Sequence, residues 1–200
     1  QLQAARDLYR IFIPHAAYLR ERLLSGELPL WNPYTRLGQP FLATLDTQSL
    51  QPLHVALVLG FGPAWGINVQ LALNTLLASA GAYLAARKLG GPRAAALVAG
   101  LFGLTPMFSR MGESLALSSA AAMSGFVLLG ALEVSRAPSL RAAAWLALPV
   151  GLSFLCGAPE MVVWQALLAL GVAAWAKDPR RALKWLAGGL AWGVGLCAAV

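Results

Sequence analysis

The placement of basic residues between apolar runs is the feature that most constrains how this chain can fold. Nine of the fifteen Lys and Arg residues lie in three short links. These links contain Arg87, Lys88 and Arg93; Arg136 and Arg141; and Lys177, Arg180, Arg181 and Lys184. The two links between them, around residues 110–113 and 157–160, carry one basic and two acidic residues. This alternation is typical of a protein that crosses a membrane repeatedly and keeps its basic links in the cytoplasm.

The bulk composition agrees with a membrane protein and argues against an ordinary soluble domain. The chain is 58% hydrophobic and 12% charged, with a mean hydropathy of +0.65. The three basic links hold a net charge of +7, and the rest of the chain is neutral. Anionic lipid at the cytoplasmic surface attracts such links, so the basic pI of about 10.1 does not require a nucleic-acid partner.

The apolar runs predict an all-α fold, a polytopic transmembrane helix bundle of about six helices within residues 63–200. The clearest run covers residues 64–86, which exceeds the roughly 20 residues that a helix needs to cross the hydrocarbon core. It ends at a basic link followed by Gly-Gly-Pro, a helix stop signal. The further runs are Ala94–Phe108, Leu115–Leu132, Ala142–Gly157, Met161–Ala176 and Ala182–Val200.

The first run enters a basic link, so residues 1–62 are expected outside the cytoplasm, as a large first extracytoplasmic loop. Residues 4–25 mix apolar and charged side chains, which predicts an interfacial helix ending at Gly26. Residues 53–61 are apolar and too short to span. The chain opens on a polar segment and stops inside an apolar run, so we expect an excerpt of a longer protein of the bacterial cytoplasmic membrane, with a further span before Gln1.

Three acidic residues are expected near lipid headgroup depth on the outer side: Asp7, Glu113 and Glu160. A carboxylate there is suited to deprotonating an acceptor hydroxyl or to holding a cation against a phosphate. The alternative is that these are solvated loop charges. Asp7 and Arg10 are three apart and share a helix face, either as part of a reacting centre or as a surface ion pair.

Three ring side chains in the outer loop have two interpretations each. His15 is suited to relaying a proton or binding a phosphate, or else it is a packing residue of an interfacial helix. Trp31 and Tyr34 are suited to stacking on a sugar ring, or else they anchor the loop at the membrane interface. We see no metal-ligand cluster in the sequence.

Several motifs of the outer loop resemble a known family. The segment Gly26-Glu-Leu-Pro-Leu-Trp-Asn-Pro-Tyr34, followed by Gly38-Gln-Pro40, Gln48 and Gln51-Pro52-Leu53, resembles the first outer loop of the YfhO-like bacterial membrane proteins. That family is similar to the GT-C superfamily of polytopic glycosyltransferases. Gly157-Ala-Pro-Glu160 resembles the family's Gly-His-Pro-Glu/Gln link, with Ala158 in place of the usual His, and Arg110-Met-Gly-Glu113 stands where a related link is expected.

The resemblance implies a GT-C-like bundle whose active site faces the outer surface. The implied activity moves a sugar from a polyprenyl-phosphate carrier to a cell-envelope glycan or glycolipid acceptor. The essential acid of such enzymes lies in the first outer loop, which assigns the catalytic role to Asp7, with Glu113 as the second candidate. The expected substrate-binding residues are Arg10, His15, Trp31, Asn32, Tyr34, Arg110 and Glu160. The resemblance leaves the need for a divalent metal open.

Two other functions stay open at this point. The first is a transporter or flippase of a lipid-linked envelope precursor, and the second is a scaffold whose outer loop binds an envelope partner. Transporters commonly carry inverted repeats and binding groups near the bilayer midplane. We see no repeat here, and the ionisable residues gather at the ends of the apolar runs, which favours surface chemistry over translocation.

Overall fold

The computed structural model describes residues 7–35, 37–104 and 114–198. Helices account for almost all of the regular structure, and the described strands form one two-residue antiparallel ladder that pairs Trp31 with Pro40. The prediction of an all-α fold is therefore confirmed. The helices are η1 Leu8–Phe12, α1 Ile13–Leu24, η2 Leu45–Thr47, α2 Pro52–Phe61, α3 Pro63–Leu104, α5 Leu115–Ala122, α6 Ser124–Arg136, α7 Leu140–Leu155, α8 Pro159–Ala174 and α9 Pro179–Ala198. The strands are β1 Trp31–Asn32 and β2 Gln39–Pro40.

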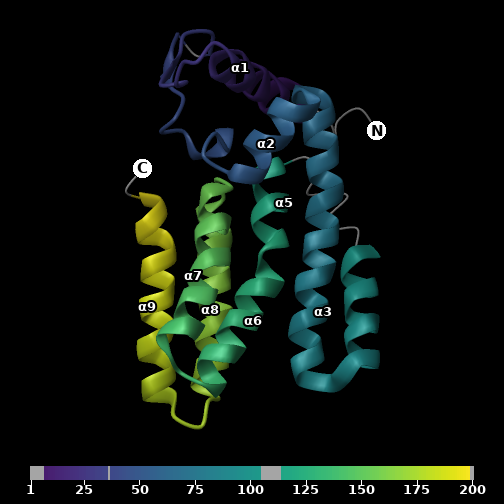
Figure 1. Ribbon diagram of the computed structural model, residues 1–200, viewed down its shortest axis with the longest axis vertical. Helices are drawn as coiled ribbons and strands as arrows, with labels where there is room; N and C mark the ends of the chain where they lie inside the picture. Colours follow the sequence, from purple (N-terminus) through teal and green to yellow (C-terminus); the bar gives the residue numbers. More distant parts are fainter. Residues whose placement is uncertain (1–6, 36, 105–113, 199–200) are drawn as a thin grey trace.

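Helices α3 and α5–α9 run along the long axis of the molecule, and α1 lies across one end (Figure 1). Helix α3 contains two antiparallel arms, because Gly91 adopts a φ of 81° and ψ of 179° just before Pro92 and reverses the chain. Proline removes a backbone donor and glycine supplies the positive φ, so this Gly-Pro pair ends the first arm. The described parts of the predicted apolar runs lie mainly in these helices.

Two stretches are long and apolar enough to cross a membrane by length and composition, Pro63–Gly103 and Leu115–Arg136. The first stretch comprises the two arms of α3. The second comprises α5 and α6, which follow one another around a turn at Met123. Helices α7 and α8 are apolar but shorter, with 16 residues each.

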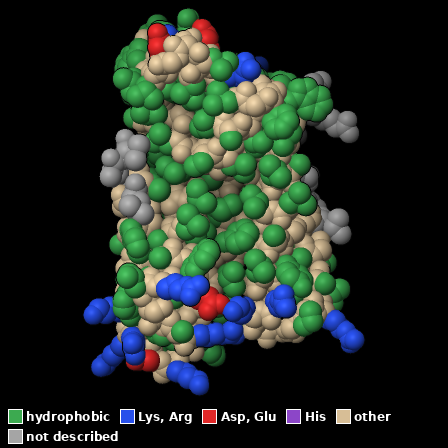
Figure 2. All heavy atoms as spheres, in the orientation of Figure 1, with side chains coloured by type: hydrophobic (Ala, Val, Ile, Leu, Met, Phe, Trp, Pro, Cys, Tyr) green, Lys and Arg blue, Asp and Glu red, His purple; other side chains and the backbone are tan. Residues whose placement is uncertain are grey.

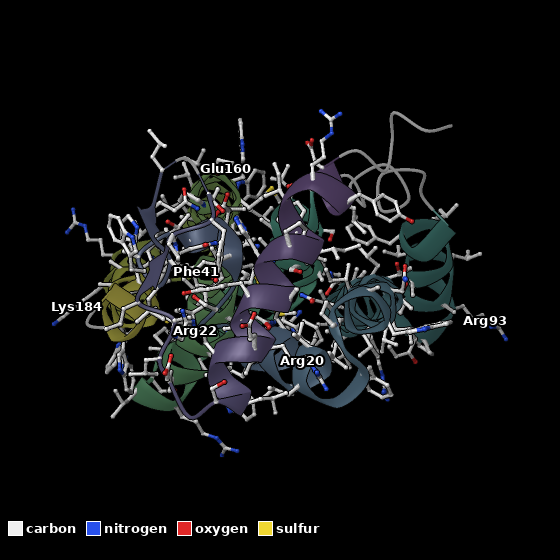
Figure 3. All side chains as sticks on the ribbon, turned by 90° about the horizontal axis from the view of Figure 1, so that it is seen from above. Arg20, Arg22, Phe41, Arg93, Glu160 and Lys184 are labelled. Atoms are coloured by element: carbon white, nitrogen blue, oxygen red, sulfur yellow. The ribbon has the colours of Figure 1, made fainter. Side chains whose placement is uncertain are left out.

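Residues 7–61 form a cap over one end of the bundle, and we call this segment the cap. Figure 3 looks down on it and shows α1 crossing the ends of the long helices. Phe12 and Ala16 of the cap pack with Ile67 of α3 and Leu115 of α5 in one buried cluster. Burial of these apolar side chains supplies the main force that holds the cap on the bundle.

Small residues allow the long helices to approach closely. A Cβ added at Gly125 of α6 would collide with the backbone of Gly81 in α3, and one at Gly193 of α9 would lie 2.6 Å from the carbonyl oxygen of Ala147 in α7. Such contacts are the usual way in which helices pack when lipid supplies no hydrophobic drive. A second buried cluster, built on Val127, Leu146 and Leu186, joins α6 to α9.

Charged and apolar side chains occupy different levels of the molecule. Figure 2 shows apolar side chains over the middle of the face and Lys and Arg gathered at the end opposite the cap. The turn at Gly91, the α6–α7 link and the α8–α9 link all lie at that end (Figure 1), and the nine basic residues of the three basic links lie in these connections or in the helix turns beside them. We call it the basic end.

Candidate functional site at the capped end

A cluster of uncharged polar side chains is buried where the cap meets the bundle. It draws on the loop before α2, on α2 itself, on the first arm of α3 and on α5. We call it the polar cluster. Every member is at most 5% exposed, and the members are Gln48, Gln51, His54, Gln70, Asn74, Ser118 and Ser119. Buried polar groups are costly unless they are hydrogen-bonded, so this concentration marks a specific arrangement.

Gln70 is the centre of the polar cluster. Its Nε2 donates to Oε1 of Gln48 at 2.9 Å and to Oγ of Ser119 at 3.0 Å. Its Oε1 lies 2.7 Å from Nδ1 of His54. Because the Gln70 nitrogen faces two acceptors, its oxygen must face His54, and Nδ1 of His54 therefore carries the proton and donates. One side chain thus joins α3 to the loop, to α2 and to α5.

Asn74 extends the polar cluster one turn further along α3. Its Nδ2 donates to Oγ of Ser118 at 3.2 Å and to Oγ of Ser119 at 3.0 Å. Ser118 in turn donates to the backbone oxygen of Leu115. Residues 70 and 74 lie on one helix face because they are four apart, so both can meet the same side of α5.

Two atoms of the polar cluster have no hydrogen-bond partner among the described residues: Nε2 of Gln48 and Nε2 of His54. Gln48 also adopts the left-handed conformation, with a φ of 52° and a ψ of 24°. The first atom is a donor, and the second is an acceptor in the tautomer that Gln70 selects. A hydroxyl group or a water satisfies both kinds of group, so the cluster is suited to neutral polar partners.

Burial lowers the pKa of His54, and the hydrogen bond with Gln70 opposes this effect only in part. The imidazole is therefore neutral at neutral pH, because a charged ring would have to give up its hydration inside the protein. The polar cluster thus carries no formal charge. It is built to position the loop and to accept hydrogen bonds, and it is not built to neutralise a phosphate.

The predicted pair Asp7 and Arg10 lies at the start of the cap. Both side chains are exposed, and within the described ranges they form no ion pair with each other. Asp7 precedes η1 without capping it through its side chain, so the carboxylate is left available to solvent. This placement permits contact with a substrate and does not by itself assign one.

His15 lies inside the cap, 7% exposed, and its ring meets Phe41 edge-on with centroids 5.6 Å apart. Tyr18 meets the same Phe41 ring at 5.0 Å. The α1 face that carries these two rings therefore packs on the loop. The structure places His15 in the interior of the cap, where its ring packs against another aromatic ring.

Trp31 and Tyr34 are the large exposed aromatics of the cap loop, with 56% and 78% of their surface accessible. Asn32 between them is buried and shapes the turn: its Oδ1 accepts from the backbone N–H of Tyr34 at 2.9 Å, and its Nδ2 donates to Thr35. Tyr18 donates to the backbone oxygen of Trp31 at 2.6 Å. The turn thus holds the rings of Trp31 and Tyr34 outward, and Asn32 fixes the shape of this turn.

The link at residues 157–160 packs directly against the cap. Gly157 has a φ of +83°, and a Cβ there would collide with the backbone of Leu45. Ala158 is buried, whereas Glu160 is exposed in the first turn of α8, at the capped end (Figure 3). The remaining predicted site residues, Arg110 and Glu113, lie outside the described residues.

Sequence reasoning placed Gln48 and Gln51 in a family-like loop motif but assigned no role to their partners. The missing residues were His54, Gln70, Asn74, Ser118 and Ser119. The available signal was the four-residue spacing of two amides inside an otherwise apolar run, which puts both on one helix face.

No group of three or more His, Cys, Asp or Glu side chains in the described part of the chain is arranged to hold a metal ion. A scan against protein-family models and searches of curated proteins and of solved structures found no match for this chain. The functional argument therefore depends on the residues and their geometry.

Proposed function

We propose that this chain is part of a polytopic membrane glycosyltransferase of the GT-C type. It would transfer a sugar from a polyprenyl-phosphate carrier to an envelope acceptor at the outer surface of the bacterial cytoplasmic membrane. The observation that carries the proposal is the separation of the two ends. The cap, with its family-like loop, lies at one end of the bundle and the nine basic link residues lie at the other (Figures 1 and 2).

Exposed aromatic residues support a membrane placement. Trp65 and Trp164 lie within the first two turns of α3 and α8, which begin near the capped end, and they are 72% and 66% exposed. Trp145 in the second turn of α7 and Trp175 after α8 lie toward the basic end and are also exposed. Tryptophan gathers at both water interfaces of membrane proteins.

The apolar surface between these levels supports the same placement. Large side chains such as Leu76, Leu97, Leu148 and Leu167 are more than half exposed in the middle of the helices. A water-soluble monomer rarely exposes apolar area of this extent, because each such side chain loses the free energy of burial. A hydrocarbon environment removes that penalty.

The proposed reaction is a direct displacement at the capped end. The acceptor hydroxyl attacks the anomeric carbon, the bond from that carbon to the phosphate oxygen breaks, and the polyprenyl phosphate leaves. Asp7 takes the hydroxyl proton, and Arg10 meets the phosphate. Trp31 and Tyr34 offer ring faces to the sugar.

The polar cluster has a supporting part in this scheme. It fixes the loop through Gln48 and Gln51, and so holds the turn of Trp31 and Tyr34 over the bundle. Arg110 is proposed as a second phosphate ligand, Glu113 as a second acid and Glu160 as an acceptor contact, in keeping with the family-like links that contain them.

Replacement of the acid tests the proposal. Membranes containing the full-length protein with Asp7→Asn should transfer sugar from a polyprenyl phosphate donor about 10² to 10⁴ times more slowly than wild type, because a general base contributes a factor of that order. Glu21→Gln is the matched control, since Glu21 is an exposed acid of α1 and should be dispensable. Full activity of Asp7→Asn would remove the assignment. Movement of the intact lipid-linked sugar across the bilayer without transfer would instead support a flippase.

Cysteine labelling tests the sidedness on which the proposal depends. Ser25 is exposed in the cap, and Ala137 is exposed at the basic end. A membrane-impermeant maleimide added to intact cells should label Ser25→Cys and leave Ala137→Cys unlabelled until the membrane is opened. The reverse pattern would place the cap in the cytosol and overturn the proposed active site.

A further inference from the structure

A long groove opens between α3, α6 and α7 and shares only Gln51 with the polar cluster. Its volume is about 1260 Å³, which exceeds the roughly 300–1,000 Å³ typical of sites for drug-sized ligands. Its walls are mostly apolar and include Leu77, Leu84, Phe126, Leu129, Trp145 and Leu148. Gln51, Pro52 and Leu53 of the cap close one end, and the other end opens among the basic residues.

The helical walls of the groove are long enough to take a lipid acyl chain. On α7 its lining runs from Arg141 to Leu152, a rise of about 16 Å at about 1.5 Å per residue. On α3 the lining runs over the same number of residues, from Leu77 to Lys88. Half of the roughly 30 Å hydrocarbon core is about 15 Å, so an acyl chain of a single leaflet fits along these walls.

The open end of the groove carries a positive charge. Arg87, Lys88, Arg141 and Glu133 line it, for a net charge of +2. Lys88 is already paired, with its Nζ 2.5 Å from Oε1 of Glu133. Arg87 and Arg141 form no ion pair within the described ranges, so both guanidinium groups are available to an anion.

A helix terminus and a fixed backbone reinforce this end. Helix α7 starts here, with Ser139 lining the groove and accepting at its Oγ from the N–H of Ala142 at 3.3 Å. The positive end of the helix dipole therefore adds to the two cations. Arg136 donates to the backbone oxygen of Lys88 at 2.8 Å, which holds the end of the first α3 arm against α6.

We infer that this groove binds an anionic phospholipid of the inner leaflet. Its acyl chains lie between α3, α6 and α7, and its phosphate contacts Arg87 and Arg141. The positive charge selects an anionic headgroup, and guanidinium groups bind phosphate oxygens in pairs of hydrogen bonds. This inference rests on the membrane placement proposed above but not on sugar transfer.

The test measures lipid binding to the full-length protein in detergent by native mass spectrometry. Phosphatidylglycerol and phosphatidylcholine of the same chain length are the two probes. Wild type should bind phosphatidylglycerol in preference. The double variant Arg87→Gln/Arg141→Gln should bind it roughly 30-fold more weakly, because each cation near anionic lipid contributes about a factor of five.

Two further variants make the outcome decisive. Arg180→Gln/Arg181→Gln removes two exposed cations in the first turn of α9 that do not line the groove, and it should bind as wild type does. Leu84→Trp fills the groove without changing charge and should weaken binding. Equal loss in both arginine pairs, equal binding of the two lipids, or a protein helix found in the groove by cross-linking would each overturn the inference.

The same samples separate this inference from the proposed function. Asp7→Asn should bind phosphatidylglycerol as wild type does, because Asp7 does not line the groove. Lipid binding without any sugar transfer would refute the enzyme proposal alone. Sugar transfer with no preference for the anionic lipid would refute the groove alone.

Discussion

Nδ1 of His54 lies 2.7 Å from Oε1 of Gln70, and this hydrogen bond fixes α2 of the cap to the first arm of α3. The His54 ring is 2% exposed and the Gln70 side chain is fully buried. Because Gln70 uses its nitrogen for Gln48 and Ser119, the imidazole must donate through Nδ1. A second proton on Nε2 would charge a ring that has no solvent around it.

The stability of the protein should therefore fall in acid. The unfolded chain binds a proton at His54 with a pKa of about 6.5, whereas burial lowers the pKa of the folded state. Below about pH 6.5 the unfolded state holds more protons than the folded one, so each further pH unit costs up to about 1.4 kcal/mol until the folded pKa is reached. Above about pH 6.5 the contribution of His54 to the free energy of unfolding is complete and no longer changes with pH.

The measurement is the midpoint of thermal unfolding of the detergent-solubilised protein between pH 5 and pH 8, for wild type and for His54→Gln. Below about pH 6.5 the unfolding midpoint should fall less steeply with decreasing pH in the variant than in wild type, whatever the stability of the variant at pH 8. Identical slopes for the two proteins would show that His54 does not titrate as its burial requires.

Gln70→Ala should be strongly destabilising. The substitution removes both hydrogen bonds that Gln70 donates. The N–H of His54 and Oε1 of Gln48 then stay buried without their hydrogen bond to Gln70. Each unsatisfied buried group costs about 1–3 kcal/mol, so a loss of at least about 2 kcal/mol is expected.

The matched control for Gln70→Ala is Asn68→Ala on the same helix. Asn68 is exposed and donates only to the backbone oxygen of Ala64, so its loss should stay within about 0.5 kcal/mol. For a chain of this size, about 1 kcal/mol shifts the unfolding midpoint by roughly 2–4 °C. Equal shifts for the two variants would mean that the polar cluster adds no stability.

Gly125→Ala should separate α6 from α3. A Cβ at this position collides with backbone atoms of Gly81 and Ala82, which no side-chain rotation can relieve. Overpacking of this kind costs about 1–3 kcal/mol. Gly100→Ala is the control, because nothing lies within 4 Å of its Cβ and alanine is favoured over glycine in a helix by about 1 kcal/mol. The midpoint of thermal unfolding should fall for Gly125→Ala and stay the same or rise for Gly100→Ala.

The helices could be located from the sequence because their signals are local. The run at residues 64–86 and its stop at Gly90-Gly91-Pro92 correspond to the first arm of α3, which ends at Gly91. The run Leu115–Leu132 was predicted as one apolar run, whereas a turn at Met123 divides it into α5 and α6. The turn is followed by Ser124-Gly125, a pair at which helices commonly kink, so the sequence carried a local signal for it.

The candidate site was less predictable because it is assembled from distant segments. Gln70 is 22 residues from Gln48 and 49 residues from Ser119 in the sequence, yet it forms hydrogen bonds with both. Local sequence periodicity cannot predict such long-range contacts. Asn32 was predicted to bind substrate, and the structure adds that it is buried and shapes the turn before Tyr34. A loop asparagine has the same sequence appearance in both roles, since its side chain is equally suited to either.

Gly157→Ala should lower sugar transfer more than it lowers binding of the anionic lipid. The positive φ of +83° strains any L side chain, and the added Cβ collides with the backbone at Leu45. The link must therefore push the loop of residues 45–51 away from the bundle, which disturbs Gln48 and the turn that presents Trp31. The groove lies chiefly along α3, α6 and α7 and is lined by only Gln51 of that loop, so it should change little. Transfer activity and phosphatidylglycerol binding measured on the same preparation check this, with Gly171→Ala as the control, because nothing lies within 4 Å of a Cβ there. Unchanged transfer in Gly157→Ala would mean that the contact between link and loop does not hold the proposed active site.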